Sequence, residues 1–548
     1  MPLQKNQVLT LRVERLSSDG SGVAHSPDGE TVFIPGAAPG DEARVRIVKD
    51  CKRYAFGILD EVLTPSPDRI PVDCAVAGPC GGCSLRHLDY AAELRAKQEN
   101  VADAFARIGG LDVPVLPIVG SPEVNRYRNK VQFPVGVDKS GKPCIGFYAG
   151  RTHRIVPCPD CRLQPGVLNE IGNALCAFFA EKGIQPYSEE TGRGLVRHIF
   201  LRRGAHSGQI MVCLVCTRAK LPSAEELCTR LKAQFAEITT ILLNVNAKNT
   251  NVILGTETHT LYGQGYIEDT LCGVPVQLGP LSFYQVNTLA AEQLYGIAAQ
   301  YAQLTQDDLL LDLYCGMGTI GLSMAAHCRE LIGVEIVPEA IESAKANAAR
   351  MGADVAAKSR FFCADAGQAA TRLAAEGLHP DIVMLDPPRK GCDEATLSAV
   401  VRMSPRRVVY VSCNPATAAR DAAWLEQNGY HAEKVQPVDL FPRTRHCEAV
   451  LLLTKLNVDR HIEVDVSMDE LDVTAAESKA TYNEIRDYVW EHYQLKVSNL
   501  YIAQVKQKYG IIERENYHKA KNENAKQPKC PKEKEDAIVE ALKHFQMI

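Results

Sequence analysis

The feature that most constrains the fold of this chain is an alternation of apolar runs with helix-like segments after residue 308. The apolar runs that are typical of buried strands are Leu309–Leu313, Leu331–Ile336, Ile382–Leu385 and Val408–Val411. Between two of them, Pro338–Met351 has the pattern of a helix. Strands that alternate with helices predict βαβ units and a mostly parallel sheet. Ligands of such sheets bind at the carboxyl ends of the strands.

The first apolar run leads into a glycine-containing turn, Asp312-Leu-Tyr-Cys-Gly-Met-Gly318. Gly316 and Gly318 lack side chains where the backbone must approach a ligand closely. Glu335 follows at the end of the next run, where an acid bonds the ribose hydroxyls in Rossmann-like folds. Asp365 ends a further strand-like run and suits a contact with an adenine edge. The pattern predicts a nucleotide-like cofactor, but by itself does not distinguish S-adenosylmethionine from a nicotinamide.

Two polar motifs follow apolar runs at the same predicted edge. Asp386 begins Asp386-Pro-Pro-Arg389, in which the prolines restrict the backbone and hold the carboxylate toward a substrate. Cys413 lies just after the run that ends at Val411 and precedes Asn-Pro. Each motif also has a plain structural reading: the first as a turn that ends a strand, the second as a small buried cysteine.

The ordered set of motifs resembles the RNA uracil-5-methyltransferases. The motifs are Ser282-Phe-Tyr-Gln-Val-Asn287, Asp312-Leu-Tyr-Cys-Gly-Met-Gly318, Leu385-Asp-Pro-Pro-Arg389, Tyr410-Val-Ser-Cys-Asn-Pro415 and Phe441-Pro-Arg-Thr-Arg-His-Cys-Glu448. The resemblance extends from residue 1 to about residue 455. It implies a Rossmann-like methyltransferase domain, S-adenosylmethionine as the cofactor and an RNA substrate.

The resemblance also implies roles for individual residues. Carbon 5 of uracil becomes nucleophilic when a thiolate adds to C6, and a base must later remove the C5 proton. By similarity, Cys413 is the nucleophile and Glu448 is the base. Asp386 and Gln285 would bond the uracil edge or the cofactor, and Tyr314 would lie against the methionine part of the cofactor.

A separate cysteine motif precedes these segments. Cys74, Cys80 and Cys83 are separated by stretches with glycines, which let a chain fold tightly around a metal centre. A 4Fe-4S cluster needs a fourth thiolate. The resemblance places it before a Leu-Gln sequence, at Cys161, with Cys158 as a rival three residues earlier. The implied metal centre is a 4Fe-4S cluster; zinc and unliganded core cysteines are the alternatives.

The sequence predicts a multidomain α/β protein. The four regions are residues 1–64, a small OB-like β-barrel that resembles a TRAM domain; 65–270, a central α/β domain with the cysteine cluster; 271–456, the methyltransferase domain; and 457–548, a helical extension of unknown function. The barrel prediction rests on short strands with Asp-Gly and Pro-Gly turns.

Two basic segments are candidates for RNA contacts. The first is a face of the barrel formed by Arg44, Arg46, Lys49, Lys52, Arg53 and Tyr54. Basic and aromatic side chains bind phosphates and stack on bases, although such a face can also be simply solvated. The second segment, Arg126–Lys130, either contacts RNA or buttresses the central domain.

Composition restricts the cellular setting. The chain has 61 Lys and Arg against 66 Asp and Glu, so RNA binding must depend on local patches. No apolar run approaches the roughly 18 residues of a membrane-spanning helix, and the N-terminus lacks a signal-peptide core. The 19 cysteines favour a reducing compartment. We therefore expect a cytoplasmic monomer.

The combination of a TRAM domain and a cysteine cluster resembles the 23S ribosomal RNA branch of the family, because the transfer RNA branch typically lacks both. The expected function is S-adenosylmethionine-dependent methylation of C5 of a uridine in 23S ribosomal RNA. The alternatives are a transfer RNA uracil-5-methyltransferase and a catalytically silent RNA-binding or ribosome-assembly factor. Cys413, Glu448, Gln285 and Asp386 are all present, which favours an enzyme.

Overall fold

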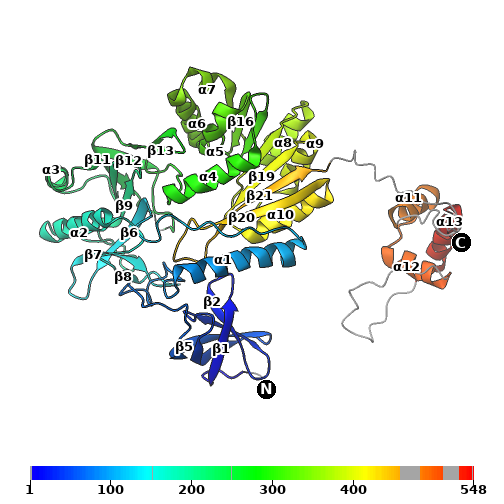
Figure 1. Ribbon diagram of the computed structural model, residues 1–548, viewed down its shortest axis with the longest axis horizontal. Helices are drawn as coiled ribbons and strands as arrows, with labels where there is room; N and C mark the ends of the chain where they lie inside the picture. The colour runs from blue at the N-terminus through cyan, green and yellow to red at the C-terminus, as the bar shows by residue number, and fades with distance from the viewer. Residues whose placement is uncertain are drawn as a thin grey trace. The chain divides into compact units, whose positions relative to one another are not determined.

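The computed structural model describes residues 3–150, 152–248, 250–456, 482–509, 530–545 and 547. The chain divides into two compact units, Met1–Asn457 and Val458–Ile548. The first unit contains a small barrel and two larger sheets, which follow one another along the chain (Figure 1).

The N-terminal segment forms a closed barrel with the strand order β1-β2-β3-β5-β4. Its strands are β1 (Val8–Leu16), β2 (Ser21–His25), β3 (Thr31–Pro35), β4 (Glu42–Asp50) and β5 (Tyr54–Thr64). Alternate residues of β4 are buried in the barrel, as a period of two requires. The predicted barrel is confirmed. Sequence reasoning missed β2, because it opens with Ser21 and Gly22 and has a weak apolar pattern.

Helix α1 (Tyr90–Ala104) follows the barrel, and a π-helical turn, Phe105–Gly109, continues it. Asp89 begins the helix, because its carboxylate accepts the amide of Ala92. Although α1 precedes the central sheet in sequence, its apolar residue Val101 packs into the core of the last sheet of this unit. The helix also buries two charged residues, Glu93 and Lys97.

The central sheet has seven strands in the order β12-β11-β10-β9-β6-β7-β8. These are β6 (Lys130–Val137), β7 (Pro143–Tyr148), β8 (Ile155–Pro157), β9 (Val196–Arg203), β10 (Ile210–Cys216), β11 (Ile238–Val245) and β12 (Glu257–Tyr262). Helices α2 (Gly166–Glu181) and α3 (Ala224–Gln234) share one apolar core with this sheet. A hairpin of β13 (Ile267–Leu271) and β14 (Val274–Leu278) follows, across the expected boundary at residue 270.

The last sheet of this unit has seven strands in the order β17-β16-β15-β18-β19-β21-β20. These are β15 (Leu309–Leu313), β16 (Glu330–Glu335), β17 (Ser359–Cys363), β18 (Ile382–Leu385), β19 (Arg407–Ser412), β20 (Tyr430–Val438) and β21 (Glu448–Lys455). Strands β15 to β19 are parallel, as predicted, whereas β21 runs antiparallel between β19 and β20. The strand order reverses between β15 and β18, and this is where ligands bind in open α/β sheets.

Helices cover both faces of this sheet (Figure 1). On one face lie α4 (Thr288–Ala302), α5 (Thr319–Met324) and α6 (Pro338–Met351). On the other lie α8 (Ala366–Ala375), α9 (Glu394–Met403) and α10 (Pro415–Gln427), together with α1. The short elements are α7 (Ala353–Lys358) and a 3-10 turn, Ala325–His327.

The second unit contains α11 (Tyr482–Tyr493), α12 (Asn499–Lys508) and α13 (Lys532–His544). They bury a shared apolar core that includes Ile485, Ile502 and Ile538. The extension that was expected to be helical thus contains these three helices among its described residues. Among the described helices, none has the length and apolar character needed to cross a membrane.

Candidate active site and cysteine-lined cavity

The glycine turn after β15 has an unusual backbone. Tyr314, Gly316 and Gly318 have φ angles of 65°, 55° and 80°, in the left-handed region that glycine adopts without strain. The amide of Gly316 donates to the Glu335 carboxylate at 3.2 Å, and the two amides that follow Glu335 donate to its other oxygen. The acid predicted to bond a ribose therefore lies beside the glycine turn.

Two other predicted cofactor residues have defined positions around this turn. The hydroxyl of Tyr314 lies 3.4 Å from the hydroxyl of Thr396 on α9. The half-buried Asp365 begins α8, where its carboxylate accepts the amide of Gln368 at 3.1 Å. Ile336, just beyond Glu335, exposes its apolar side chain. The glycine turn, the acid and an exposed apolar side chain thus lie along one edge of the sheet.

Four polar side chains interact at the carboxyl edge of β18 and β19. They are Asp386, Arg389, Cys413 and Glu448. The register explains the pairing of the last two, because Ser412 of β19 is opposite Ala449 of β21. Cys413 leaves β19 at the point where Glu448 enters the antiparallel β21, so two residues distant in sequence reach the same place.

The electrostatics of this group favour protonated acids. Glu448 is 5% exposed, and burial raises its pKa to about 8; the Asp386 carboxylate adds to the shift and Arg389 opposes it. Burial also raises the pKa of Asp386 to about 7. The pKa of the half-buried Cys413 thiol is raised by burial and by Glu448, and Arg389, which bonds the thiol, lowers it. Arg389 is therefore the group that favours a thiolate.

Arg389 belongs to one of the sequence motifs, but no role was predicted for it. Its carbonyl accepts the side-chain amide of Asn414 at 2.9 Å, which fixes the Asp-Pro-Pro-Arg turn to the residue after Cys413. Asn414 also begins α10 by accepting the amide of Ala416. The sequence feature that could have identified Arg389 is its position at the end of a proline-restricted turn after a buried strand.

Gln285 reaches the same region from the segment before α4. Its side chain bonds Tyr295 of α4, and Tyr295 in turn interacts with Asp386. The carbonyl of Gln285 accepts the side-chain amide of Asn129 at 2.7 Å. Two residues earlier, Phe283 is 72% exposed, the highest exposure among the large apolar side chains that the structure describes. Gln285, which is predicted to bond the uracil edge or the cofactor, is thus tied both to the acid cluster and to the central sheet.

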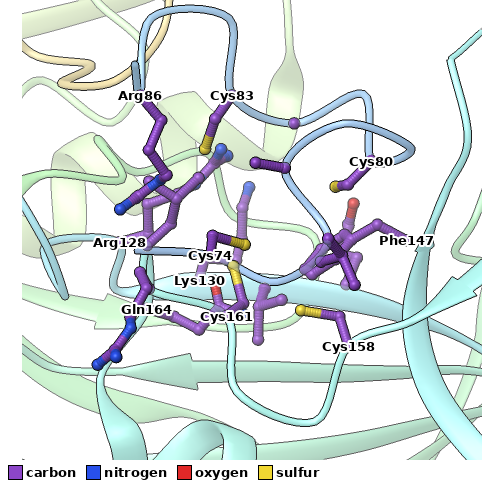
Figure 2. A pocket seen from close by; sticks show the side chains of 17 residues that line it. Cys74, Cys80, Cys83, Arg86, Arg128, Lys130, Phe147, Cys158, Cys161 and Gln164 are labelled. Carbon is purple, nitrogen blue, oxygen red and sulfur yellow. The ribbon is translucent and has the colours of Figure 1, made fainter. Parts of the chain in front are cut away.

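Five cysteines line a cavity of about 260 Å³ between the segment after the barrel and the β8–α2 connection. They are Cys74, Cys80, Cys83, Cys158 and Cys161. Figure 2 shows their side chains around a common space. Both candidates for the fourth ligand, Cys158 and Cys161, line the cavity as free cysteines. Their thiols form a hydrogen bond with each other, which lowers the pKa of Cys161. The structure thus brings the predicted cysteines together across nearly a hundred residues of sequence.

Positive charge surrounds these thiols. Arg86, Arg128 and Lys130 line the same cavity, and the Arg86 guanidinium interacts with Cys83. Burial lowers the pKa of Lys130 to about 8. Among the described residues, no group of three or more His, Cys, Asp or Glu side chains is placed to hold a single metal ion. The thiols surround a space, and cationic side chains that suit a negatively charged occupant complete its wall.

The segment Arg126–Lys130 links the cysteine-lined cavity to the segment that precedes Glu448. Arg126 donates to the carbonyl of Cys161 at 2.8 Å, and the amide of Arg128 donates to that of Leu163 at 2.9 Å. Tyr127 donates to the carbonyl of Pro442 at 3.0 Å. Of the two readings of this segment, its contacts support the role of a buttress.

The basic face of the barrel is partly neutralised. Arg44 pairs with Glu61 at 2.8 Å, and Arg46 makes two bonds to Asp60. Next to this face, three rings form a cluster with centroid separations of 5.6 to 5.8 Å. The rings belong to Phe33, Tyr54 and Phe56. Because Arg44 and Arg46 are already paired with acids, the aromatic cluster is the stronger candidate for a surface that stacks on RNA bases.

Two family profiles match the chain. The tRNA (Uracil-5-)-methyltransferase profile matches residues 206–456, and the TRAM domain profile matches residues 2–59. An uncharacterized RNA methyltransferase of Halalkalibacterium halodurans is 43% identical over 457 residues, which cover 83% of this chain and 99% of the relative. Another, from Oceanobacillus iheyensis, is 41% identical over 455 residues, with coverage of 83% and 98%.

One solved structure is similar over most of the chain. It is the Pyrococcus abyssi tRNA (uracil-54, C5)-methyltransferase in complex with S-adenosyl-L-homocysteine. The TM-score is 0.65 at 27% sequence identity, and the match covers 81% of this chain and 100% of that chain. The predicted fold, a small barrel followed by a Rossmann-like methyltransferase sheet, is confirmed.

Proposed function

The chain belongs to the tRNA (uracil-5-)-methyltransferase family, and we propose that it methylates C5 of a uridine in 23S ribosomal RNA with S-adenosylmethionine. One observation carries the chemical part of the proposal: Cys413 and Glu448 meet at one end of the β19–β21 ladder beside Asp386 and Arg389. Substitution at C5 needs a thiolate, a base and polar groups for the uracil edge, and this cluster contains candidates for all three.

The reaction begins at Cys413. Its thiolate adds to C6, a carbon–sulfur bond forms, and C5 becomes an enolate carbon. C5 attacks the methyl carbon of S-adenosylmethionine, whose sulfonium bond breaks to leave S-adenosylhomocysteine. Glu448 takes the proton from C5, the electron pair restores the C5–C6 double bond, and the bond to Cys413 breaks.

Arg389 and Asp386 tune these steps. Arg389 favours the thiolate of Cys413 because it opposes the pKa increase that burial causes. The Asp386 carboxylate disfavours ionisation of Glu448, whose pKa of about 8 is the higher of the two. Glu448 must therefore lose its own proton before it can accept the proton from C5. Gln285, which is linked to Asp386 through Tyr295, completes the uracil-edge contacts.

The glycine turn supplies the cofactor contacts in this proposal. Gly316 and Gly318 allow the methionine part of the cofactor to approach the backbone, and Tyr314 of the same turn lies beside it. Glu335 would accept from the ribose hydroxyls, and Asp365 would bond the adenine edge. Each of these carboxylates has more lone pairs than the backbone amides occupy, so it can also accept hydrogen bonds from the cofactor.

We assign the cysteine-lined cavity to a 4Fe-4S cluster held by Cys74, Cys80, Cys83 and Cys161, with Cys158 as the rival to Cys161. The residues fit such a group, because the thiols surround a space and four thiolates need nearby positive charge. That charge is provided by Arg86, Arg128 and Lys130. When bound, the cluster would cross-link the loop after the barrel to the loop before α2. Methyl transfer itself uses none of its electrons.

The remaining parts are assigned to RNA. A uridine within folded RNA must be unstacked before C5 is reached, at a cost of a few kcal/mol, and further RNA contacts can offset that cost. We assign residues 1–64 to RNA binding, 65–270 to support of the cysteine centre and 271–456 to catalysis. The exposed Phe283 is placed to stack on an unpaired base next to Gln285.

A transfer RNA substrate is the second candidate. The observation that favours it is the similarity to a solved structure whose name states a tRNA activity. The five-cysteine cavity favours 23S ribosomal RNA instead, by resemblance to that branch of the family.

The two substrates are separated by a direct assay. The protein is incubated with methyl-labelled S-adenosylmethionine and either protein-free 23S ribosomal RNA or bulk transfer RNA, and the labelled nucleoside is identified. We expect 5-methyluridine in the ribosomal RNA alone, and no label with the Cys413→Ala variant. Label in transfer RNA alone would keep the chemistry and overturn the substrate assignment.

A further inference from the structure

The connection between β20 and β21, residues 439–447, leads directly into Glu448, the proposed general base. Val438 of β20 pairs with Glu448 of β21, so the connection closes on the strand pair at the catalytic residue. A nine-residue connection between two paired ends can adopt many conformations, and each would direct Glu448 differently. The contacts that hold this connection therefore bear on catalysis.

Arg443 lies at the centre of this connection in a strained conformation. Its φ angle is 69°, a left-handed value that is unfavourable for a residue with a Cβ. Such conformations persist when the surroundings over-determine them, and they cluster at functional sites. Arg443 is 8% exposed, so the surrounding contacts are protected from water.

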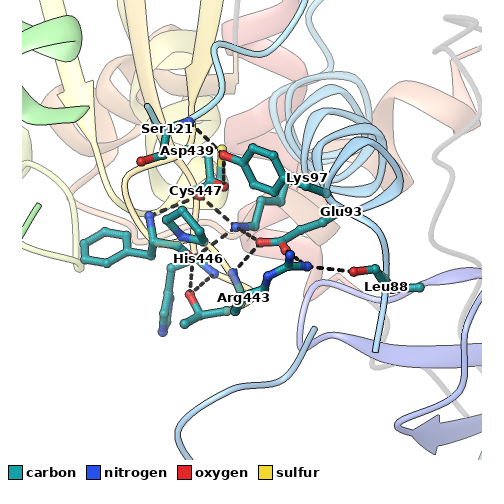
Figure 3. A network of polar contacts seen from close by, with 12 residues as sticks. Leu88, Glu93, Lys97, Ser121, Asp439, Arg443, His446 and Cys447 are labelled. Atoms are coloured by element: carbon teal, nitrogen blue, oxygen red, sulfur yellow. Dashed lines mark hydrogen bonds and ion pairs between the residues drawn. The ribbon is translucent and has the colours of Figure 1, made fainter. Parts of the chain in front are cut away.

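Four hydrogen bonds hold Arg443. Its amide donates to the carboxylate of Glu93 at 2.7 Å, and its guanidinium donates to the carbonyl of Leu88 at 2.7 Å. Its carbonyl accepts the amides of Ser84 and Leu85, each at 3.1 Å. All four partners come from one segment of the chain, which runs from the residue after Cys83 into α1. Figure 3 shows the bonds of Arg443 with Leu88 and Glu93.

A buried ion network holds the start of the same connection. Lys97 of α1 lies 2.7 Å from the Glu93 carboxylate and 2.8 Å from that of Asp439, and none of these side chains is more than 1% exposed. Tyr90 donates to the other oxygen of Asp439 at 2.9 Å. Charges this deeply buried are tolerated when they are paired and hydrogen-bonded, so the network defines one arrangement of α1 and the connection.

We propose that Arg443 is a positioning residue for Glu448, and that through it the cysteine segment holds the base in place. The inference rests on the proposed function. Each step of the path is a covalent connection or a hydrogen bond. Cys83 is followed by Ser84 and Leu85, whose amides donate to the Arg443 carbonyl. Glu448 lies five residues after Arg443 in the chain. A cysteine centre outside the methyl-transfer chemistry thereby acquires a role in it.

The test separates the step that uses Cys413 from the step that uses Glu448. Wild-type protein and Arg443→Ala are given the RNA that the wild type methylates, made with uridine tritiated at C5. Formation of a covalent protein–RNA adduct reports the first step, and release of tritium reports the second. We expect Arg443→Ala to form the adduct while releasing tritium at least about tenfold more slowly, so that adduct accumulates.

Two variants make the result specific. Arg443→Gly tolerates the left-handed backbone and keeps the amide and carbonyl contacts, so it should release tritium faster than Arg443→Ala. Arg406→Ala is the matched control: it removes two hydrogen bonds to Asp308 near the opposite, amino ends of the strands. It should change adduct formation and tritium release by the same factor. Equal losses of both steps in Arg443→Ala would overturn the positioning role.

The link to the cysteines is tested without turnover. Hydrogen exchange is measured in the RNA-free protein for a peptide that spans residues 439–448. We expect faster exchange in Arg443→Ala and in Cys83→Ala, and unchanged exchange in Arg406→Ala. Unchanged exchange in Cys83→Ala would overturn the link. If the wild type methylated no RNA, the proposed function would fail, whereas the exchange data would still decide the link.

Discussion

Cys413 and Glu448 lie at matching ends of neighbouring antiparallel strands, because Ser412 of β19 is opposite Ala449 of β21. The pairing places the proposed nucleophile and the proposed base side by side although the chain between them forms a helix and a strand. It also makes the two residues electrostatically dependent, since Glu448 contributes to the raised pKa of the Cys413 thiol.

The first prediction concerns the nucleophile. Cys413→Ala should abolish methylation while retaining the cofactor, because the glycine turn and Glu335 lie at the ends of β15 and β16, which β18 separates from β19. Methylation is followed with labelled S-adenosylmethionine, and cofactor affinity by calorimetry. Normal turnover in this variant would refute the mechanism.

The second prediction concerns the base. Glu448→Gln should accumulate a covalent protein–RNA adduct, because thiolate addition and methyl transfer precede removal of the C5 proton. A denaturing gel detects the adduct as a shifted band. The double variant Cys413→Ala/Glu448→Gln is the control and should show none. If the single variant gave no band, a different residue would have to be the base.

The third prediction concerns Arg389. Arg389→Met should raise the pKa of Cys413, because it removes the positive group that favours the thiolate. Alkylation of Cys413 at pH 7 should slow roughly tenfold for each pKa unit. Lys390→Met removes the adjacent positive charge and serves as the matched control. Equal alkylation rates in the two variants would exclude a specific role for Arg389.

The fourth prediction is a pH dependence of stability. The pKa of Glu448 is about 8 in the folded protein against an ordinary value of 4.5, so the folded state binds the proton more tightly than the unfolded state. This contribution is fully present below pH 4.5 and is lost as the pH rises through about 8. The free energy of unfolding from urea titrations should therefore fall between pH 5.5 and 8.5. Glu448→Gln should flatten the slope, and an unchanged slope would contradict the raised pKa.

The fifth prediction concerns the cysteine-lined cavity. Anaerobically prepared protein should contain iron and absorb broadly near about 400 nm. Cys161→Ser should lose both signals, whereas Cys158→Ser, its neighbour in the same cavity, should keep them. The reverse result would make Cys158 the fourth ligand. Stoichiometric zinc without iron would replace the cluster with a zinc site.

Local pattern predicted much of this protein from sequence alone. Apolar runs of strand length determined the parallel strands β15 to β19, because buried strands need apolar residues on both faces. The motifs that end these runs identified Cys413, Asp386 and the glycine turn, since chain direction assigns residues after parallel strands to one edge. The five cysteines were identified by spacing and resemblance. Strand β2 was missed because its first residues are small and polar.

Long-range packing determined the rest, since it depends on residues that no local pattern connects. The role of Arg389 depends on the folding of the Asp-Pro-Pro-Arg turn against Asn414. Helix α1 looks like an ordinary helix in sequence, yet its buried Lys97 finds Asp439, more than three hundred residues later. A buried charge is stable only beside its partner. That partner is chosen by the tertiary fold, which in this protein joins the segment after the cysteines to the connection that carries the base.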